Sequence, residues 1–283
     1  MAVFNRLYRG AEKIFAGRRR RYLTAFTAEL KKMKVMLDAG HYGRRNQSPV
    51  LPESYDSIAM WRLCELLAEE LESYGIEVGK TRTEQGRDLA VTTRGRMAYG
   101  YDLFISLHSN ASVKESVDRV DIYAPFDVSL EQKELPSLLI NAISELMDVS
   151  KGSVKKRVND SGNEYYGVMR GARYVGCPMY MIVEHSFHTN KKAALWLSSD
   201  ENLKRLARIE AAVIASFYRI KRDFLKGDVD MDGDFDSVDV MLIKRAYFGT
   251  LALDEAQKKL ADMNSDGKID VFDYLLAKRS FFE

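Results

Sequence analysis

Two short apolar runs in the sequence each lead to a histidine, and these histidines are the first candidates for chemistry. Residues 35–39 lead to His41, and residues 103–107 lead to His108. Each run is typical of a buried strand, so we expect each imidazole at the end of its strand. A hydrolytic zinc site needs about three nitrogen or oxygen ligands and one open position. Two strand-end imidazoles would supply part of that set.

Two acidic residues are candidates for the rest of the site. Glu53 follows the first strand and opens a long helix, where the positive helix end favours a carboxylate. We therefore expect Glu53 to bind zinc together with the two histidines. Glu184 ends an apolar run over residues 180–184. Its carboxylate is free to take a proton from water and return it to a leaving amine.

Structural roles also remain open for these residues. A single histidine at a strand end is more often held by hydrogen bonds than by a metal, although two with the same local pattern weigh against that reading. Glu53 alone is also compatible with a simple charge at a helix start. His185 and His188 follow Glu184 on a loop, where each either bonds substrate or faces solvent.

The elements that must position these residues alternate between strands and helices. This order predicts an α/β fold with a mostly parallel sheet flanked by helices, which binds ligands at the carboxyl ends of its strands. Besides the three runs above, we expect strands at 76–78 and 120–124, helices at 58–74, 88–99, 135–147 and 190–220, and an exposed polar loop at 150–164.

Four ordered segments resemble motifs of the zinc-dependent N-acetylmuramoyl-L-alanine amidases of the type 3 family. They are Asp38-Ala-Gly-His-Tyr-Gly43, Arg94-Gly-Arg-Met-Ala98, Asp102-Leu-Phe-Ile-Ser-Leu-His-Ser-Asn-Ala111, and Cys177-Pro178 through Val183-Glu-His-Ser-Phe-His-Thr-Asn190. The resemblance covers about residues 34–220. It implies hydrolysis of the amide between N-acetylmuramic acid and L-alanine of peptidoglycan.

The same resemblance implies roles for individual residues. His41, Glu53 and His108 would bind zinc, and Glu184 would act as general base and then as general acid. We assign substrate contacts to Arg94, Asn110 and His185. The chain departs from the family pattern at four positions that would line the cleft: Ala39, Tyr42, His185 and Ser186. Two rival functions stay open, namely a non-catalytic module that holds wall polymer and a zinc peptidase of related fold.

A twelve-residue acidic pattern occurs twice near the C-terminus, at 228–239 and again 34 residues later at 262–273. This pattern is typical of a calcium loop, which has oxygen ligands at positions 1, 3 and 5, glycine at 6, a backbone carbonyl ligand at 7 and an acid at 12. The first loop would bind through Asp228, Asp230, Asp232, Asp234 and Asp239. The second would bind through Asp262, Asn264, Asp266, Lys268 and Asp273, with position 7 contributing its carbonyl.

The duplicated loops, each followed by a helix, closely resemble a type I dockerin. The resemblance implies a small all-α calcium-binding loop-helix duplication with two Ca²⁺ ions, which binds a cohesin on a scaffoldin or surface protein. Specificity in the family lies at loop positions 10 and 11, and basic pairs follow on the helices. The expected cohesin contacts are Ser237, Val238, Lys244, Arg245, Val271, Phe272, Lys278 and Arg279.

Charge is distributed unevenly along the 283 residues. Residues 1–34 carry a net charge of +8 and residues 227–283 carry −6. We expect a basic extension at 1–33, an amidase domain at 34–222 and a dockerin domain at 227–283.

The basic run lacks a nucleic-acid motif, although an anionic wall polymer or lipid surface would suit it. No apolar run reaches the roughly 18 residues of a membrane span. The dockerin favours an extracellular or cell-surface location, without a clear signal peptide.

Overall fold

The computed structural model describes residues 32–129, 132–221 and 224–282. The chain divides into two compact units, Met1–Lys221 and Arg222–Glu283. The expected basic extension at 1–33 falls almost entirely outside the described residues. Among the described residues, no helix is both long enough and apolar enough to cross a membrane.

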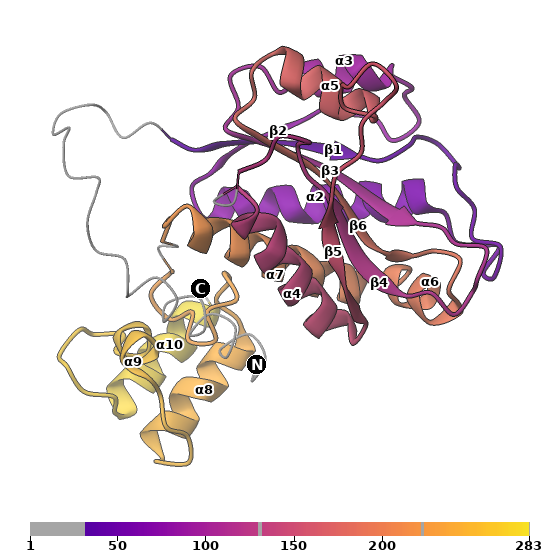
Figure 1. The fold of residues 1–283 in the computed structure, drawn as a ribbon. Coiled ribbons are helices and arrows are strands. Elements are labelled where there is room, and N and C mark those ends of the chain that lie inside the picture. Colours follow the sequence, from indigo (N-terminus) through magenta and orange to yellow (C-terminus); the bar gives the residue numbers. More distant parts are fainter. Residues whose placement is uncertain (1–31, 130–131, 222–223, 283) are drawn as a thin grey trace, which may run out of the picture. The chain divides into compact units, whose positions relative to one another are not determined.

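The N-terminal unit is built on a six-stranded sheet (Figure 1). The strand order is β2-β1-β3-β6-β4-β5. Strands β2, β1, β3 and β6 are mutually parallel, β4 is antiparallel to β6, and β5 is parallel to β4. The strands are β1 (Lys34–Ala39), β2 (Glu77–Lys80), β3 (Leu103–Asn110), β4 (Arg119–Tyr123), β5 (Ser150–Lys155) and β6 (Met179–Phe187). The predicted fold, a mostly parallel sheet flanked by helices, is confirmed.

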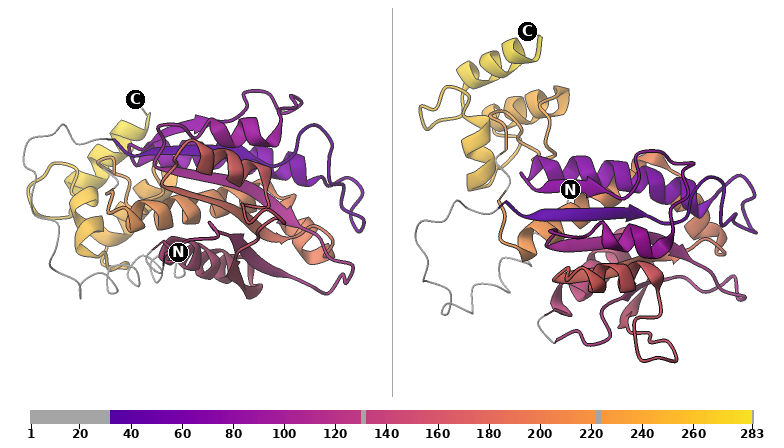
Figure 2. Two further views of the ribbon diagram at one scale, coloured as in Figure 1. Left: turned by 45° about the horizontal axis from the view of Figure 1, so that its top comes forward. Right: turned by 90° about the horizontal axis from the view of Figure 1, so that it is seen from above.

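Helices cover both faces of this sheet (Figures 1 and 2). Helices α2 (Asp56–Ser73), α4 (Glu134–Met147) and α7 (Asp200–Phe217) cover one face, and α3 (Val91–Arg96) and α5 (Gly167–Tyr174) cover the other. Because successive strand residues point to opposite faces, Leu37 and Ile105 join the larger core, whereas Met36 and Phe104 join the smaller one. His108 therefore shares the α3/α5 face with Phe104.

Two local expectations for this unit were wrong. Residues 150–155 form the edge strand β5 and not a loop, because backbone pairing with β4 outweighs their polar composition. The expected helix over 190–220 is two helices, α6 (Lys191–Leu197) and α7. The break occurs where the Ser199 side chain accepts a hydrogen bond from the Asn202 amide and caps α7.

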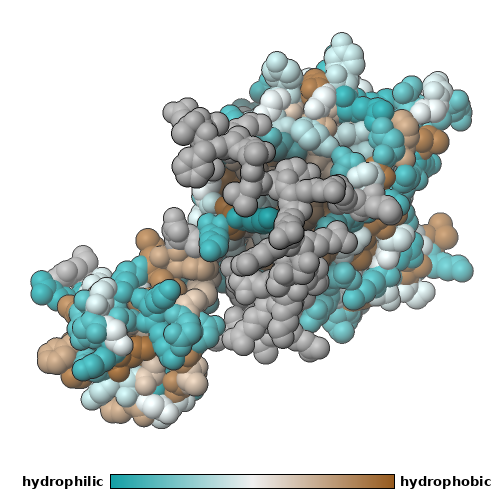
Figure 3. All heavy atoms as spheres, turned by 60° about the vertical axis from the view of Figure 1, so that its left-hand side comes forward, coloured by the Kyte–Doolittle hydropathy of each residue, from teal (hydrophilic) through white to brown (hydrophobic). Residues whose placement is uncertain are grey.

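The C-terminal unit contains three helices in its described residues: α8 (Ser237–Tyr247), α9 (Glu255–Ala261) and α10 (Val271–Phe282). The all-α loop-helix duplication is confirmed, and α9 between the two repeats is an addition to it. The buried part of its core is small, namely Val229, Leu242, Ile243, Ala261 and Ala277. Apolar side chains also reach its surface (Figure 3).

Candidate metal and catalytic sites

The end of β1 brings His41 close to β3. At Gly40 an added Cβ would lie 2.5 Å from Cε1 of His108 and 2.6 Å from the carbonyl oxygen of Leu107. Only glycine therefore permits this approach. His41 itself has a positive φ of 54°, which turns the chain sharply after the strand. The two imidazole rings end up with their centroids 5.0 Å apart.

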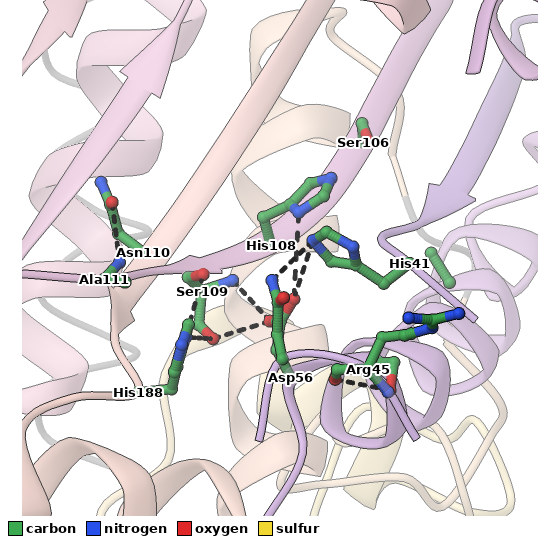
Figure 4. A network of polar contacts seen from close by, with 12 residues as sticks. His41, Arg45, Asp56, Ser106, His108, Ser109, Asn110, Ala111 and His188 are labelled. Atoms are coloured by element: carbon green, nitrogen blue, oxygen red, sulfur yellow. Dashed lines mark hydrogen bonds and ion pairs between the residues drawn. The ribbon is translucent and has the colours of Figure 1, made fainter. Parts of the chain in front are cut away.

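Asp56, the first residue of α2, completes a three-residue group with the two histidines (Figure 4). Its Oδ2 lies 3.7 Å from Nε2 of His41 and 3.9 Å from Nδ1 of His108. This buried Oδ2 accepts no hydrogen bond from the residues that the structure describes. An ion between the three side chains would give this oxygen a partner.

The other carboxylate oxygen of Asp56 is fixed by β3. Oδ1 accepts hydrogen bonds from the backbone amide of Ser109 at 2.7 Å and from its hydroxyl at 2.6 Å. Nδ1 of His188 lies 3.0 Å from the same hydroxyl. Burial raises the pKa of Asp56 to about 6, although these hydrogen bonds work in the opposite direction. One oxygen is thus locked while the other points at the histidines.

Both histidines of the group favour the neutral form. Burial lowers the pKa of His41, and burial together with the neighbouring His41 holds that of His108 well below its usual value. The amide nitrogen of Asn46 lies 2.8 Å from Nε2 of His41, so this ring nitrogen carries a lone pair. A neutral imidazole with a lone pair is the form that binds a metal.

Glu184 lies beside this group on the neighbouring strand. It pairs in register with His108 across β3 and β6, and its buried Oε2 accepts no hydrogen bond within the described parts of the chain. Burial, with a smaller contribution from the negative charge of Asp56, raises the pKa of Glu184 to about 8. A carboxylate with this pKa is suited to exchange protons near neutral pH.

The acidic loops of the C-terminal unit are closed by their own backbone amides. Asp228 accepts hydrogen bonds from the amides of Asp232 and Gly233, and the buried Asp239 accepts them from Val229 and Asp230. The carboxylates of positions 1, 3 and 5 of this loop come together as one group. Burial and mutual repulsion raise the pKa of Asp228 to about 6 and that of Asp230 to about 7.

The second loop repeats this arrangement. Asp262 accepts hydrogen bonds from the amides of Asp266 and Gly267, and Asp273 accepts them from Asn264 and Asp270. The expected contacts for a partner lie on the following helices. Seven of the eight residues are exposed, and only Val238 is half-buried: Ser237, Val238, Lys244, Arg245, Val271, Phe272, Lys278 and Arg279.

Family models identify both units. Residues 35–216 match the N-acetylmuramoyl-L-alanine amidase model, which is more than half of the chain. The chain belongs to the N-acetylmuramoyl-L-alanine amidase family. Residues 226–281 match the dockerin type I domain, so the amidase unit is followed by a dockerin. No curated protein sequence matches the chain.

Three solved structures illustrate the likeness of the amidase unit. Cwp6 from Clostridium difficile is 26% identical with a TM-score of 0.58 over 65% of this chain, and the match spans only 29% of that protein. An N-acetylmuramoyl-L-alanine amidase from C. difficile 630 is 19% identical with a TM-score of 0.58, covering 67% of this chain and 98% of the other. The catalytic domain of CwlV, an amidase from Bacillus (Paenibacillus) polymyxa var. colistinus, is 17% identical with a TM-score of 0.57. This match covers 67% of this chain and 99% of the other.

The amidase unit corrects the expected acidic ligand. Glu53 is exposed in the turn before α2, whereas Asp56 three residues later lies at the histidines. The choice depends on the path of the loop that joins β1 to α2, which apolar periodicity does not reveal. The available signal was the position of Asp56 two residues before Ile58, where the helical periodicity starts.

Two of the expected substrate contacts are buried structural residues. Arg94 donates to both carboxylate oxygens of Asp38 and to the carbonyl of Ala39, and so fixes the end of β1. His185 is fully buried on the opposite face from Glu184. Its Nε2 lies 2.6 Å from Glu210 on α7, and its Nδ1 lies 3.0 Å from the His108 carbonyl. Neither side chain is available to substrate.

The remaining histidine differs from expectation, whereas the substrate contact expected of Asn110 stays a prediction. His188 is buried and contacts Ser109, so it supports Asp56 and does not face solvent. Asn110 accepts a hydrogen bond from the amide of Ala111 and lies away from the two histidines (Figure 4). The sequence interpretation missed the roles of Asp56, Ser109 and His188, because their contacts join segments far apart in the chain.

Proposed function

We propose that this chain is a zinc-dependent N-acetylmuramoyl-L-alanine amidase that hydrolyses the amide between N-acetylmuramic acid and L-alanine in peptidoglycan. The observation that carries the proposal is the Oδ2 of Asp56, which lies between two neutral histidines and accepts no hydrogen bond from the described part of the chain, with Glu184 in register beside them. Family membership supports the substrate and the bond that is cleaved.

The donor set fits zinc. Tetrahedral zinc with bonds of about 2.0–2.2 Å requires ligand atoms roughly 3.3–3.6 Å apart. The separations of 3.7 and 3.9 Å from Asp56 Oδ2 are close to this requirement. His41, Asp56 and His108 would hold the ion, and Asn46 would give up its contact with His41. Bound zinc would act as a Lewis acid and make a coordinated water more acidic.

Glu184 performs the proton transfers in this proposal. Its ionised carboxylate accepts a proton from the attacking water and delivers it to the leaving nitrogen of L-alanine. Arg94 and Ser109 act indirectly, because Arg94 holds the end of β1 and Ser109 holds Asp56. The covered faces of the sheet keep these side chains in fixed positions.

The dockerin unit is proposed to bind two calcium ions and to attach the enzyme to a cohesin. Asp228 and Asp262 would open the two loops, and the exposed residues of α8 and α10 would contact the partner. The combination of a wall amidase and a dockerin supports an extracellular or cell-surface location.

The reaction is tested by digesting purified peptidoglycan with and without a zinc chelator and analysing the products by mass spectrometry. We expect peptides with a free L-alanine amino group and glycan strands with intact sugar linkages. Glu184→Gln should lower kcat about 10²- to 10⁴-fold while zinc content stays unchanged. Glu145→Gln, an exposed glutamate on α4, is the matched control.

The same digestion, together with a calorimetric measurement of muropeptide binding and a peptide substrate that lacks the sugar, separates the rival functions. Binding of muropeptides without any turnover would identify a non-catalytic module. Cleavage within peptides that lack the sugar would identify a zinc peptidase. Normal release of stem peptides by Glu184→Gln would remove Glu184 from the reaction.

A further inference from the structure

A row of ionisable side chains, which includes the proposed catalytic base, crosses the sheet. His108 on β3 pairs in register with Glu184 on β6, which pairs with Asp121 on β4. Residues that pair across neighbouring strands point to the same face, so Asp121 lies on the face that carries Glu184. The mechanism above does not use Asp121.

Asp121 orients an arginine at the end of the sheet where the histidines lie. Its buried Oδ2 accepts hydrogen bonds from Nε of Arg119 at 2.9 Å and from Nζ of Lys155 at 2.7 Å. Because β4 is antiparallel to β6, Arg119 lies toward the carboxyl end of β6. The guanidinium also lies 5.1 Å from the centroid of the Phe187 ring, which limits its movement.

The outer half of this guanidinium remains available to a ligand. The Arg119 side chain is 38% exposed. Its two terminal nitrogens make no hydrogen bond to any residue in the described segments. A guanidinium that is held through Nε presents its remaining N–H groups as a rigid fork, which matches a carboxylate.

We propose that Arg119 binds a carboxylate of the stem peptide, namely the α-carboxylate of the D-glutamyl residue that follows L-alanine. This inference rests on the proposed function, because it names a substrate group for the same cleft. Neighbouring strands are about 4.8 Å apart, so β4 lies roughly 10 Å from the strand of His108. Two extended residues span about 7 Å, and the arginine side chain covers the difference.

The proposal predicts discrimination between two ligands that differ in one group. N-acetylmuramoyl-L-alanyl-D-isoglutamic acid carries the carboxylate, and N-acetylmuramoyl-L-alanyl-D-isoglutamine carries an amide there. The full-length protein, loaded with zinc and calcium, should prefer the acid by about tenfold or more, as expected for a charge-assisted bidentate contact. Dissociation constants are measured by calorimetry in the Glu184→Gln background, and kcat/KM is measured in the parent enzyme.

Variants at Arg119 identify the residue responsible. Arg119→Gln should reduce the preference to less than twofold, whereas Arg119→Lys, which keeps the charge, should retain part of it. Arg62→Gln removes an exposed arginine that pairs with Asp200 and should leave the preference unchanged. Melting temperature and zinc content of each variant show that the fold and the metal site persist.

The outcomes separate this inference from the proposed reaction. Equal affinity for acid and amide in the parent protein, or an unchanged preference in Arg119→Gln, overturns the role of Arg119. Tighter binding of the acid without cleavage of either ligand supports the role of Arg119 and contradicts the amidase reaction. Cleavage of both ligands at equal kcat/KM supports the reaction and rejects the carboxylate contact.

Discussion

The two regions that would hold metal ions are assembled in opposite ways. In the amidase unit the donors come from the ends of two strands and the start of a helix, and a core on each face of the sheet holds these elements. In the dockerin unit each ion would lie in twelve consecutive residues, beside a core that has only five buried apolar side chains among the described residues. The first site is therefore a product of the fold, whereas in the second unit the fold should depend on the ions.

Selective metal removal should give the largest difference between the two regions. EGTA should unfold the dockerin unit, because calcium at about 1,000 times its Kd contributes about 4 kcal/mol per site. A zinc-selective chelator such as 1,10-phenanthroline should abolish hydrolysis and leave the sheet folded. Hydrogen exchange measured by mass spectrometry on the full chain resolves the two units. Loss of protection in β1 and β3 after zinc removal would contradict the comparison.

Within the amidase unit, removal of the proposed zinc ligand Asp56 should have nearly as large an effect as removal of the zinc itself. Asp56→Ala should remove stoichiometric zinc and the hydrolytic activity that depends on it, because both histidines alone leave the ion with too few protein ligands. Glu53→Ala should retain both, since its side chain is exposed. Zinc is measured by atomic emission on the purified proteins. The opposite result would restore Glu53 as the ligand.

This contrast explains what the sequence could reveal. The duplicated loop-helix units of the dockerin were predictable, because the residue types that mark each loop follow a fixed spacing within one short segment. The strands leading to His41 and His108 were also predictable, since apolar runs and their ends are local features. Asp56 was not identified, because the loop before α2 determines which acid reaches the histidines. Strand β5 was missed because its pairing with β4 is not encoded in its own polar residues.

Removal of a contact that holds Asp56 in place should lower zinc affinity less than removal of Asp56 itself. Ser109→Ala removes the hydroxyl that donates to Asp56 Oδ1 but keeps the backbone amide at 2.7 Å. Zinc affinity should therefore fall about tenfold, at the low end of the 10- to 100-fold range for such supporting contacts. A chromophoric chelator measures it by competition. Ser73→Ala, which removes an exposed hydroxyl from α2, is the matched control and should change nothing.

The smallest predicted effect is the pH dependence of the dockerin. The raised pKa values of Asp228, about 6, and Asp230, about 7, mean that the calcium-free folded loop binds more protons than the unfolded chain. The stability of the calcium-free unit should therefore fall as pH rises between about 4 and 7. Calcium displaces these protons, so its affinity should rise several-fold across the same window.

Calorimetric calcium titrations of the full chain at pH 5.5 and pH 8 measure this change. Asp230→Asn should weaken calcium binding at both pH values and reduce the pH dependence, because one of the two shifted carboxyl groups is gone.

The histidine–aspartate site offers a useful contrast, since two of its three donors are imidazoles whose pKa values burial lowers. Between pH 8 and pH 6.5 the zinc affinity of this site should fall less than that of a site built from exposed histidines, where protons compete with the metal. An equal or greater loss would show that burial does not keep the imidazoles neutral and ready to bind.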